Sequence, residues 1–105
     1  MKNIASMDQY NEVIEGEGAV VMFTAGWCPD CTIIEPLLPV LEENHSELEF
    51  YKVNRDEFIE LCQELDIFGI PSFVVFKEGN EVDRFVSKDR KTMEEIDSFL
   101  TKAKQ

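Results

Sequence analysis

Two stretches of the chain are apolar without interruption, and they indicate its architecture. Residues 19–23 read Ala-Val-Val-Met-Phe, and residues 73–76 read Phe-Val-Val-Phe. A strand without polar alternation is buried on both faces, which is typical of a largely parallel sheet covered by helices. The pattern therefore predicts two central strands.

The helices expected near the two ends of the chain begin at capping boxes. Ser6 and Gln9 form the first such pattern, and Thr92 and Glu95 form the second. Apolar residues follow both at helical spacing. They are Met7, Tyr10, Val13 and Ile14 after the first box, and Met93, Ile96, Phe99 and Leu100 after the second.

Two further helices are expected in the middle of the chain. One follows Cys31 and contains Pro36, which should kink it one turn later, and Pro39, which should disturb it again. The other covers Phe58–Leu65, with apolar residues on one side. Its opposite side is acidic and is expected to face solvent, with Glu57, Glu60 and Glu64.

The remaining strands complete an α/β pattern. Residues 48–54 predict a strand, and residues 77–80 predict a hairpin turn into a half-exposed strand at 82–86. Residues 2–4 allow a short strand in front. Together these elements predict one domain over residues 1–105, a central mixed four- to five-stranded sheet sandwiched by four helices.

Composition narrows the classes of function. The formal net charge of −12 argues against nucleic acid and anionic membranes as partners. The first six residues lack the apolar core of a signal peptide, and three cysteines do not suggest a disulfide framework. We therefore expect a cytoplasmic protein that is monomeric by default.

The stretch Trp27-Cys28-Pro29-Asp30-Cys31 carries the candidate chemistry. Two cysteines three positions apart can meet in the first turn of a helix. Unpaired N–H groups and the positive end of the helix dipole there favour a thiolate. A Cys-x-x-Cys pair beside a strand–helix–strand pattern is typical of a dithiol–disulfide redox centre.

A metal site is the alternative for this cysteine pair. It would need Cys62 and His45 to complete a Cys3His set, but a helix from Cys31 to Asn44 would place His45 roughly 20 Å away along the axis. Cys62 is interpreted as a small core residue and His45 as a solvated turn residue. We therefore expect no metal.

With these motifs in order, the sequence resembles the thioredoxin family over essentially the whole chain. Each motif alone is weak, but their order and separation make the resemblance specific. They are Phe23, Ala25, Trp27, Cys28 and Cys31; Pro36, five residues after the second cysteine; Lys52-Val53-Asn54; Gly69-Ile70-Pro71-Ser72-Phe73; and Phe76-Lys77-Glu78-Gly79.

The resemblance implies a role for each site residue. Cys28 would attack a substrate disulfide, and Cys31 would resolve the mixed disulfide by attacking Cys28. Ile70 and Pro71 would form a cis peptide facing the dithiol, and the backbone of Ile70 would pair with a bound substrate segment. Trp27 would shape the floor of the groove.

The resemblance also implies an electron source and partners. No cofactor would be bound beyond the redox-active disulfide itself. Electrons would come from an NADPH-dependent thioredoxin reductase or an equivalent donor, and the substrates would be disulfide-bearing proteins. The Trp-Cys-Pro-Asp-Cys stretch is also similar to that of small thioredoxin-related proteins, which suggests a narrow substrate range.

The sequence departs from the family between the cysteines. Pro29 and Asp30 stand where Gly-Pro is usual. Proline is well tolerated at the first helical position, but a carboxylate beside both sulfurs disfavours a second negative charge. The hypothesis is that Asp30 raises the pKa of Cys28.

Two other departures concern the resolving step and the groove. The family's buried Asp, six residues before the first cysteine, falls on Met22, so that Asp30 or Lys52 (through water) is the candidate proton acceptor. Resolution should then be slower. Thr24 replaces the usual Trp, and the segment 87–91 has no glycine, which predicts an altered groove.

Three functions remain open from the sequence. The leading one is a thiol–disulfide oxidoreductase that reduces protein disulfides or thiol adducts. The alternatives are a redox-sensing binding module and an electron donor dedicated to a single thiol enzyme. Two cysteines favour turnover over binding alone.

Overall fold

The sheet is mixed and five-stranded, with the order β1-β3-β2-β4-β5. The computed structural model describes residues 1–105. β1 and β2 both pair in parallel with β3, whereas β4 pairs antiparallel with β2 and β5. This confirms the expected mixed sheet. The strands are β1 Lys2–Asn3, β2 Ala19–Thr24, β3 Glu49–Asn54, β4 Ser72–Lys77 and β5 Asn80–Phe85.

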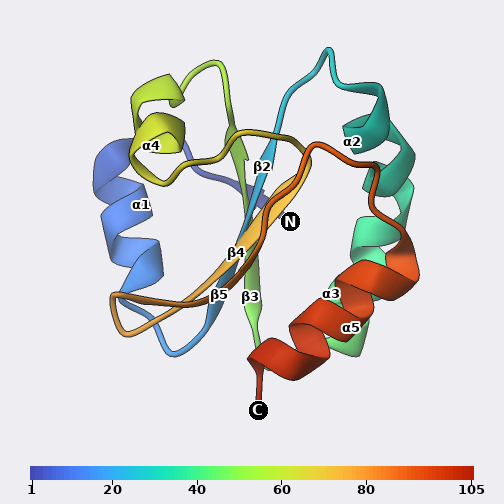
Figure 1. Ribbon diagram of the computed structural model, residues 1–105. Coiled ribbons are helices and arrows are strands. Elements are labelled where there is room, and N and C mark those ends of the chain that lie inside the picture. The colour runs from blue at the N-terminus through green and yellow to red at the C-terminus, as the bar shows by residue number, and fades with distance from the viewer.

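Helices cover both faces of this sheet (Figure 1). α1 and α4 lie on one face, and α2, α3 and α5 lie on the other. The central strands β2 and β4 are buried along nearly their whole length, as their continuous apolar runs predict. The helices are α1 Met7–Ile14, α2 Pro29–Ile34, α3 Leu38–Asn44, α4 Ile59–Glu64 and α5 Met93–Ala103.

The chain after the cysteines follows the expected kink. A 3-10 turn, η1 (Glu35–Leu37), separates α2 from α3 and contains Pro36. Pro39 has a different effect from the expected one, because it lies in the first turn of α3. A proline there removes no helical hydrogen bond, so it starts the new helix rather than disturbing it.

Both predicted capping patterns lie at helix starts, but only Thr92 and Glu95 form a complete capping box, because Oε1 of Gln9 accepts a hydrogen bond from the backbone N–H of Ala5. The Ser6 hydroxyl accepts a hydrogen bond from the backbone N–H of Gln9 at the start of α1. At the start of α5 the bonds run both ways between Thr92 and Glu95. Each cap typically stabilises its helix by about 1 kcal/mol.

The hairpin between β4 and β5 turns over two residues with positive φ. Glu78 has a φ of 52° and Gly79 a φ of 86°, the backbone of a tight turn that matches the twist of its strands. A register shift beside Val75 and Phe76 interrupts the strand pairing, and Val82 is exposed. The half-exposed strand expected at 82–86 is therefore present as β5, with irregular pairing at that point.

His45 is the clear error of the sequence interpretation. It is buried rather than solvated, with 2% of its surface exposed, and its Nε2 lies 2.7 Å from Oδ1 of Asp97. The contact joins the end of α3 to α5. A lone histidine between polar residues gave no hint of it, because its partner lies 52 positions away.

No helix combines the length and apolar character needed to cross a bilayer.

Candidate active site

The two cysteines lie where the chain passes from β2 into α2. Cys28 is the N-cap residue of α2, and Pro29 occupies the first helical position. The backbone N–H of Cys31 donates a hydrogen bond to Sγ of Cys28 over 3.1 Å. The helix start therefore directs an N–H group at the first sulfur, as the sequence predicts.

Cys28 and Cys31 form a disulfide, with Cα atoms 5.2 Å apart. Both residues are buried, and they pack with Ala25 and Ile70 in a small apolar cluster of their own. The structure therefore shows the oxidised form of a dithiol in a largely dry setting, which limits competing reactions with solvent.

A cis peptide bond between Ile70 and Pro71 faces the disulfide. The Ile70 carbonyl oxygen lies 3.8 Å from Sγ of Cys28. The preceding Gly69 is packed so tightly that a Cβ atom there would lie 2.2 Å from the carbonyl oxygen of Ser87. The segments before β4 and after β5 are thus held together beside the first sulfur.

Trp27 is the exposed aromatic residue of the site, with 61% of its surface open to solvent. Its indole N–H donates a hydrogen bond to Oδ2 of Asp56 over 2.8 Å. The Arg55 guanidinium lies 5.7 Å from its ring centroid. The loop after β3 therefore fixes the indole, a contribution that the sequence interpretation did not identify.

Asp30 is not a free carboxylate between the cysteines. Its Oδ1 accepts a hydrogen bond from Nε of Arg90 over 2.9 Å, in an ion pair that joins α2 to the segment before α5. The sequence interpretation missed Arg90. Sixty positions separate the two residues, and no local pattern connects them.

Lys52 is also paired, and its partner was not expected. Its ammonium contacts the carboxylate of Glu35, which stands one helical turn after Cys31. Met22, the neighbour of Lys52 across the parallel strands, is fully buried in the core. The spacing of four residues between Cys31 and Glu35 was the signal that could have drawn attention to Glu35.

Lys91 is the least expected residue near the site, since only 2% of its surface is exposed. Its ammonium donates hydrogen bonds to the carbonyl oxygens of Ser87 and Asp89 and lies 5.3 Å from the Phe85 ring centroid. Burial lowers its pKa, while the nearby Asp89, Asp30 and Glu95 oppose that shift. Lys91 thus closes the turn that carries Arg90.

The third cysteine takes no part in the site. Cys62 is buried in the core under α4, and desolvation raises the pKa of its thiol, with Arg55 acting in the opposite direction. No group of three or more His, Cys, Asp or Glu side chains is arranged to hold a metal ion. The Cys3His alternative therefore has no geometric basis.

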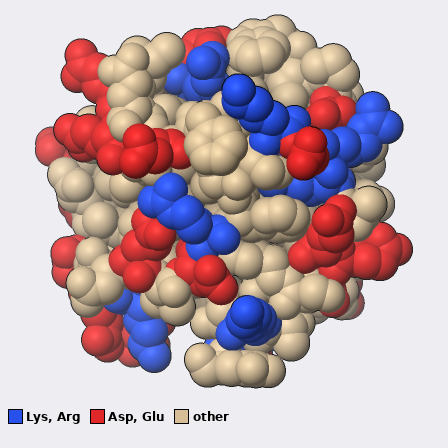
Figure 2. Space-filling model, viewed as in Figure 1, with Lys and Arg blue, Asp and Glu red and all other residues tan.

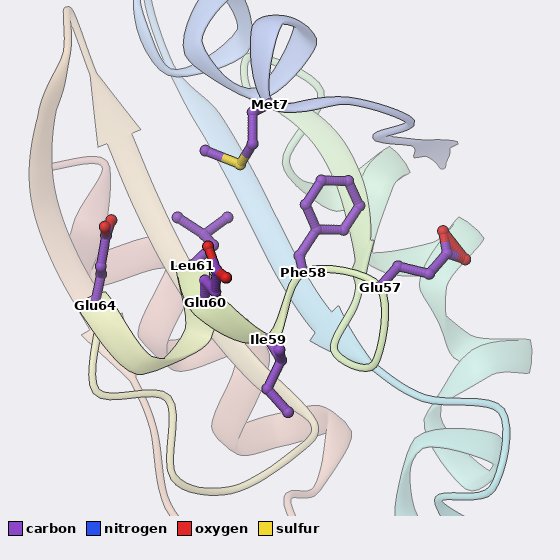
Figure 3. A pocket seen from close by; sticks show the side chains of 7 residues that line it. All are labelled: Met7, Glu57, Phe58, Ile59, Glu60, Leu61 and Glu64. Atoms are coloured by element: carbon purple, nitrogen blue, oxygen red, sulfur yellow. The ribbon is translucent and has the colours of Figure 1, made fainter.

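A separate cavity of about 390 Å³ lies between α1 and α4. Apolar side chains, with Met7 above Phe58 and Leu61, form its interior, and Glu57 and Glu64 point outward on opposite sides (Figure 3). The acidic side of α4 is exposed, as expected. The cavity contains no thiol and no basic group, so it does not belong to the redox centre.

Comparison with known proteins agrees with this geometry. The thioredoxin family model matches residues 2–102. The chain belongs to the thioredoxin family. It is 33% identical to thioredoxin AMT13 of Alternaria alternata over 97 residues, covering 90% of this chain and 82% of that protein.

Solved thioredoxin structures overlay closely on this chain. The crystal structure of Malassezia sympodialis thioredoxin has a TM-score of 0.84 at 31% identity, covering 99% of this chain and 93% of that one. Oxidised Plasmodium falciparum thioredoxin has a TM-score of 0.83 at 26% identity, covering 97% and 96%. The family and the disulfide together identify the protein as a thiol–disulfide oxidoreductase, and thioredoxins need no bound cofactor.

Proposed function

We propose that the protein reduces disulfides in other proteins, with Cys28 as the attacking thiolate and Cys31 as the resolving cysteine. The observation that carries this assignment is the unequal setting of the two sulfurs. Sγ of Cys28 receives the N–H of Cys31 and borders the Ile70 carbonyl, whereas Cys31 lies inside the first turn of α2.

The exchange then runs in two balanced steps. The Cys28 thiolate attacks one sulfur of the substrate, so that a mixed disulfide forms and the other substrate sulfur leaves as a thiolate. Cys31 loses its proton and attacks Cys28, which forms the Cys28–Cys31 disulfide and releases the second substrate thiolate. Both electrons end on the substrate.

The substrate segment is proposed to lie along Ile70. The Ile70 carbonyl oxygen lies 3.8 Å from Sγ of Cys28, so the Ile70 backbone is close enough to the dithiol to pair with an extended chain. Trp27 forms the exposed floor beside it. Pro29 occupies the first position of α2 between the two cysteines and is proposed to tune their redox behaviour.

The proton of Cys31 is proposed to pass toward the Glu35–Lys52 pair through water. Asp30 is the weaker candidate because Arg90 already binds its carboxylate. Glu35 stands one helical turn after Cys31, and Lys52 holds it in place. Replacing Glu35 with Gln should slow resolution and increase the trapped mixed disulfide.

Electrons are proposed to come from an NADPH-dependent thioredoxin reductase, in a reducing compartment such as the cytoplasm. Related proteins include one named mitochondrial, thioredoxin-2 of Schizosaccharomyces pombe, which is 33% identical over 94 residues. Fractionation of the source cells would test the compartment. Activity with dithiothreitol but not with the reductase would indicate another donor.

The deciding experiment compares three serine variants in the reduction of a protein disulfide by NADPH and the reductase. Cys28→Ser should abolish turnover. Cys31→Ser should accumulate a mixed disulfide through Cys28, and Cys62→Ser is the matched control that should retain activity. Equal rates for the wild type and Cys28→Ser would contradict the assignment, and binding without turnover would favour the redox-sensing module.

A further inference from the structure

We propose that Arg90 is a positioning residue of the dithiol: it fixes the Asp30 carboxylate and screens its charge, which keeps the Cys28 thiolate accessible. The inference rests on the proposed attack by Cys28. The sequence hypothesis treated Asp30 as an unpaired charge that raises the pKa of Cys28. In the structure, Arg90, which lies outside α2, forms an ion pair with Asp30 and opposes that effect.

The need for such a residue follows from the position of Asp30. Its carboxylate belongs to the same turn of α2 as the two sulfurs and is partly exposed, with 28% of the side chain open to solvent, whereas the Arg90 side chain is 65% exposed. A nearby negative charge of this kind disfavours a thiolate. A bound guanidinium offsets that effect and restricts the rotamers of the carboxylate.

The segment that carries Arg90 is anchored independently of the ion pair. Lys91 donates to two carbonyl oxygens within the turn, and its ammonium stands over the Phe85 ring. The backbone of Ser87 packs directly on Gly69. Because its backbone is already fixed, Arg90 loses less conformational freedom on pairing than a residue in a mobile loop does.

Other cations near Asp30 do not duplicate this contact. The Lys91 ammonium is committed to the carbonyl oxygens of its own turn, while Lys88 is exposed and does not bond to Asp30. Lys and Arg atoms gather where Figure 1 places α2 and the β5–α5 segment, and further Lys and Arg atoms lie among acidic and uncharged ones elsewhere on this face (Figure 2). Within this group, the bond to Asp30 comes from Arg90.

Loss of Arg90 should raise the pKa of Cys28. Without Arg90, the Asp30 carboxylate loses its bonded cation and keeps only the more distant Lys91 ammonium, and its side chain is no longer held away from the sulfurs. The Cys28 thiolate then becomes less favourable, so its pKa rises and the thiolate fraction at neutral pH falls. For one charge at several Å near the surface, the expected rise is about half a pKa unit.

A double-mutant cycle on the reduced protein tests this coupling. The four proteins are the wild type, Arg90→Gln, Asp30→Asn and the double variant, and Lys88→Gln is the matched control for loss of a charge in the same segment. Iodoacetamide labelling is followed against pH by tandem mass spectrometry, whose fragment ions assign the label to Cys28 and not to Cys31 or Cys62. This readout does not depend on turnover.

Arg90→Gln should raise the Cys28 pKa by about 0.5, which leaves roughly threefold less thiolate below the pKa. The shift should be clearly smaller in the Asp30→Asn background, and smaller for Lys88→Gln. Equal shifts in both backgrounds, or equal shifts for Arg90→Gln and Lys88→Gln, would overturn the proposal. Absence of reductase activity alongside the expected coupling would contradict the proposed function instead.

Discussion

Cys28 and Cys62 are almost equally buried, with 4% and 3% of their surfaces exposed, yet their surroundings are opposite. Cys28 lies at the start of a helix, where an N–H group points at its sulfur. Cys62 lies within the apolar core beneath α4, where burial raises the pKa of its thiol. We therefore expect the reactivity of these two thiols to follow the polar groups around each sulfur and not its exposure.

The largest difference between the two cysteines is expected when each is replaced by serine. Cys28→Ser should lower disulfide reductase turnover by at least ~1000-fold, because the attacking group is lost. Cys62→Ser should leave turnover within about twofold but lower the free energy of unfolding by about 1–3 kcal/mol, since it buries a hydroxyl. Coupled NADPH oxidation and urea denaturation measure the two effects.

Alkylation of the reduced protein compares the thiols directly. At pH 7 Cys28 should react with iodoacetamide at least ~50-fold faster than Cys62, because a raised pKa leaves less thiolate at a given pH. Mass spectrometry of the labelled peptides gives both rates. Rapid labelling of Cys62 in the folded protein would contradict this; in urea the difference should largely disappear.

Gly69→Ala should perturb the setting of Cys28. The added methyl group would lie 2.2 Å from the Ser87 carbonyl oxygen, so the two backbones must separate. We expect a loss of about 1–3 kcal/mol in unfolding free energy, together with slower labelling of Cys28. Gly26→Ala is the matched control, because a methyl group added there would have no other atom within 4 Å.

The smallest expected effect concerns Arg55, which touches both regions. Its guanidinium stands over Trp27, and its charge lowers the pKa of Cys62 against the effect of burial. Arg55→Gln should therefore raise the Cys62 pKa further and slow its labelling at pH 9 by about twofold. Lys77→Gln is the matched control, because it removes an exposed charge at the last residue of β4. It should leave the labelling rate of Cys62 unchanged.

The sequence predicts most of the fold because the fold follows from local patterns. The two continuous apolar runs became the central strands β2 and β4, and the kink at Pro36 appeared as η1. The effect of Pro39 was misjudged because a proline in a helix interior and one in a first turn look identical in sequence. Local signals thus place elements better than they describe helix boundaries.

The candidate site is only partly visible in the sequence. The Cys28–Cys31 spacing is a local signal and was sufficient to identify the disulfide. The partners of Asp30 and His45 are not local, since Arg90 and Asp97 lie 60 and 52 positions away. Long-range pairs of charged or polar side chains leave no periodic trace, so the structure was needed to find them.

Because Ser87 packs closely on Gly69, the surroundings of the cysteines depend on a segment that is synthesised late. During synthesis the ribosome releases both cysteines well before the turn that contains Arg90 and Lys91. A nascent chain that ends before this turn therefore carries the cysteine pair without the wall beside Ile70 or the cation on Asp30. The dithiol acquires its final surroundings only when the last part of the protein has emerged and folded back.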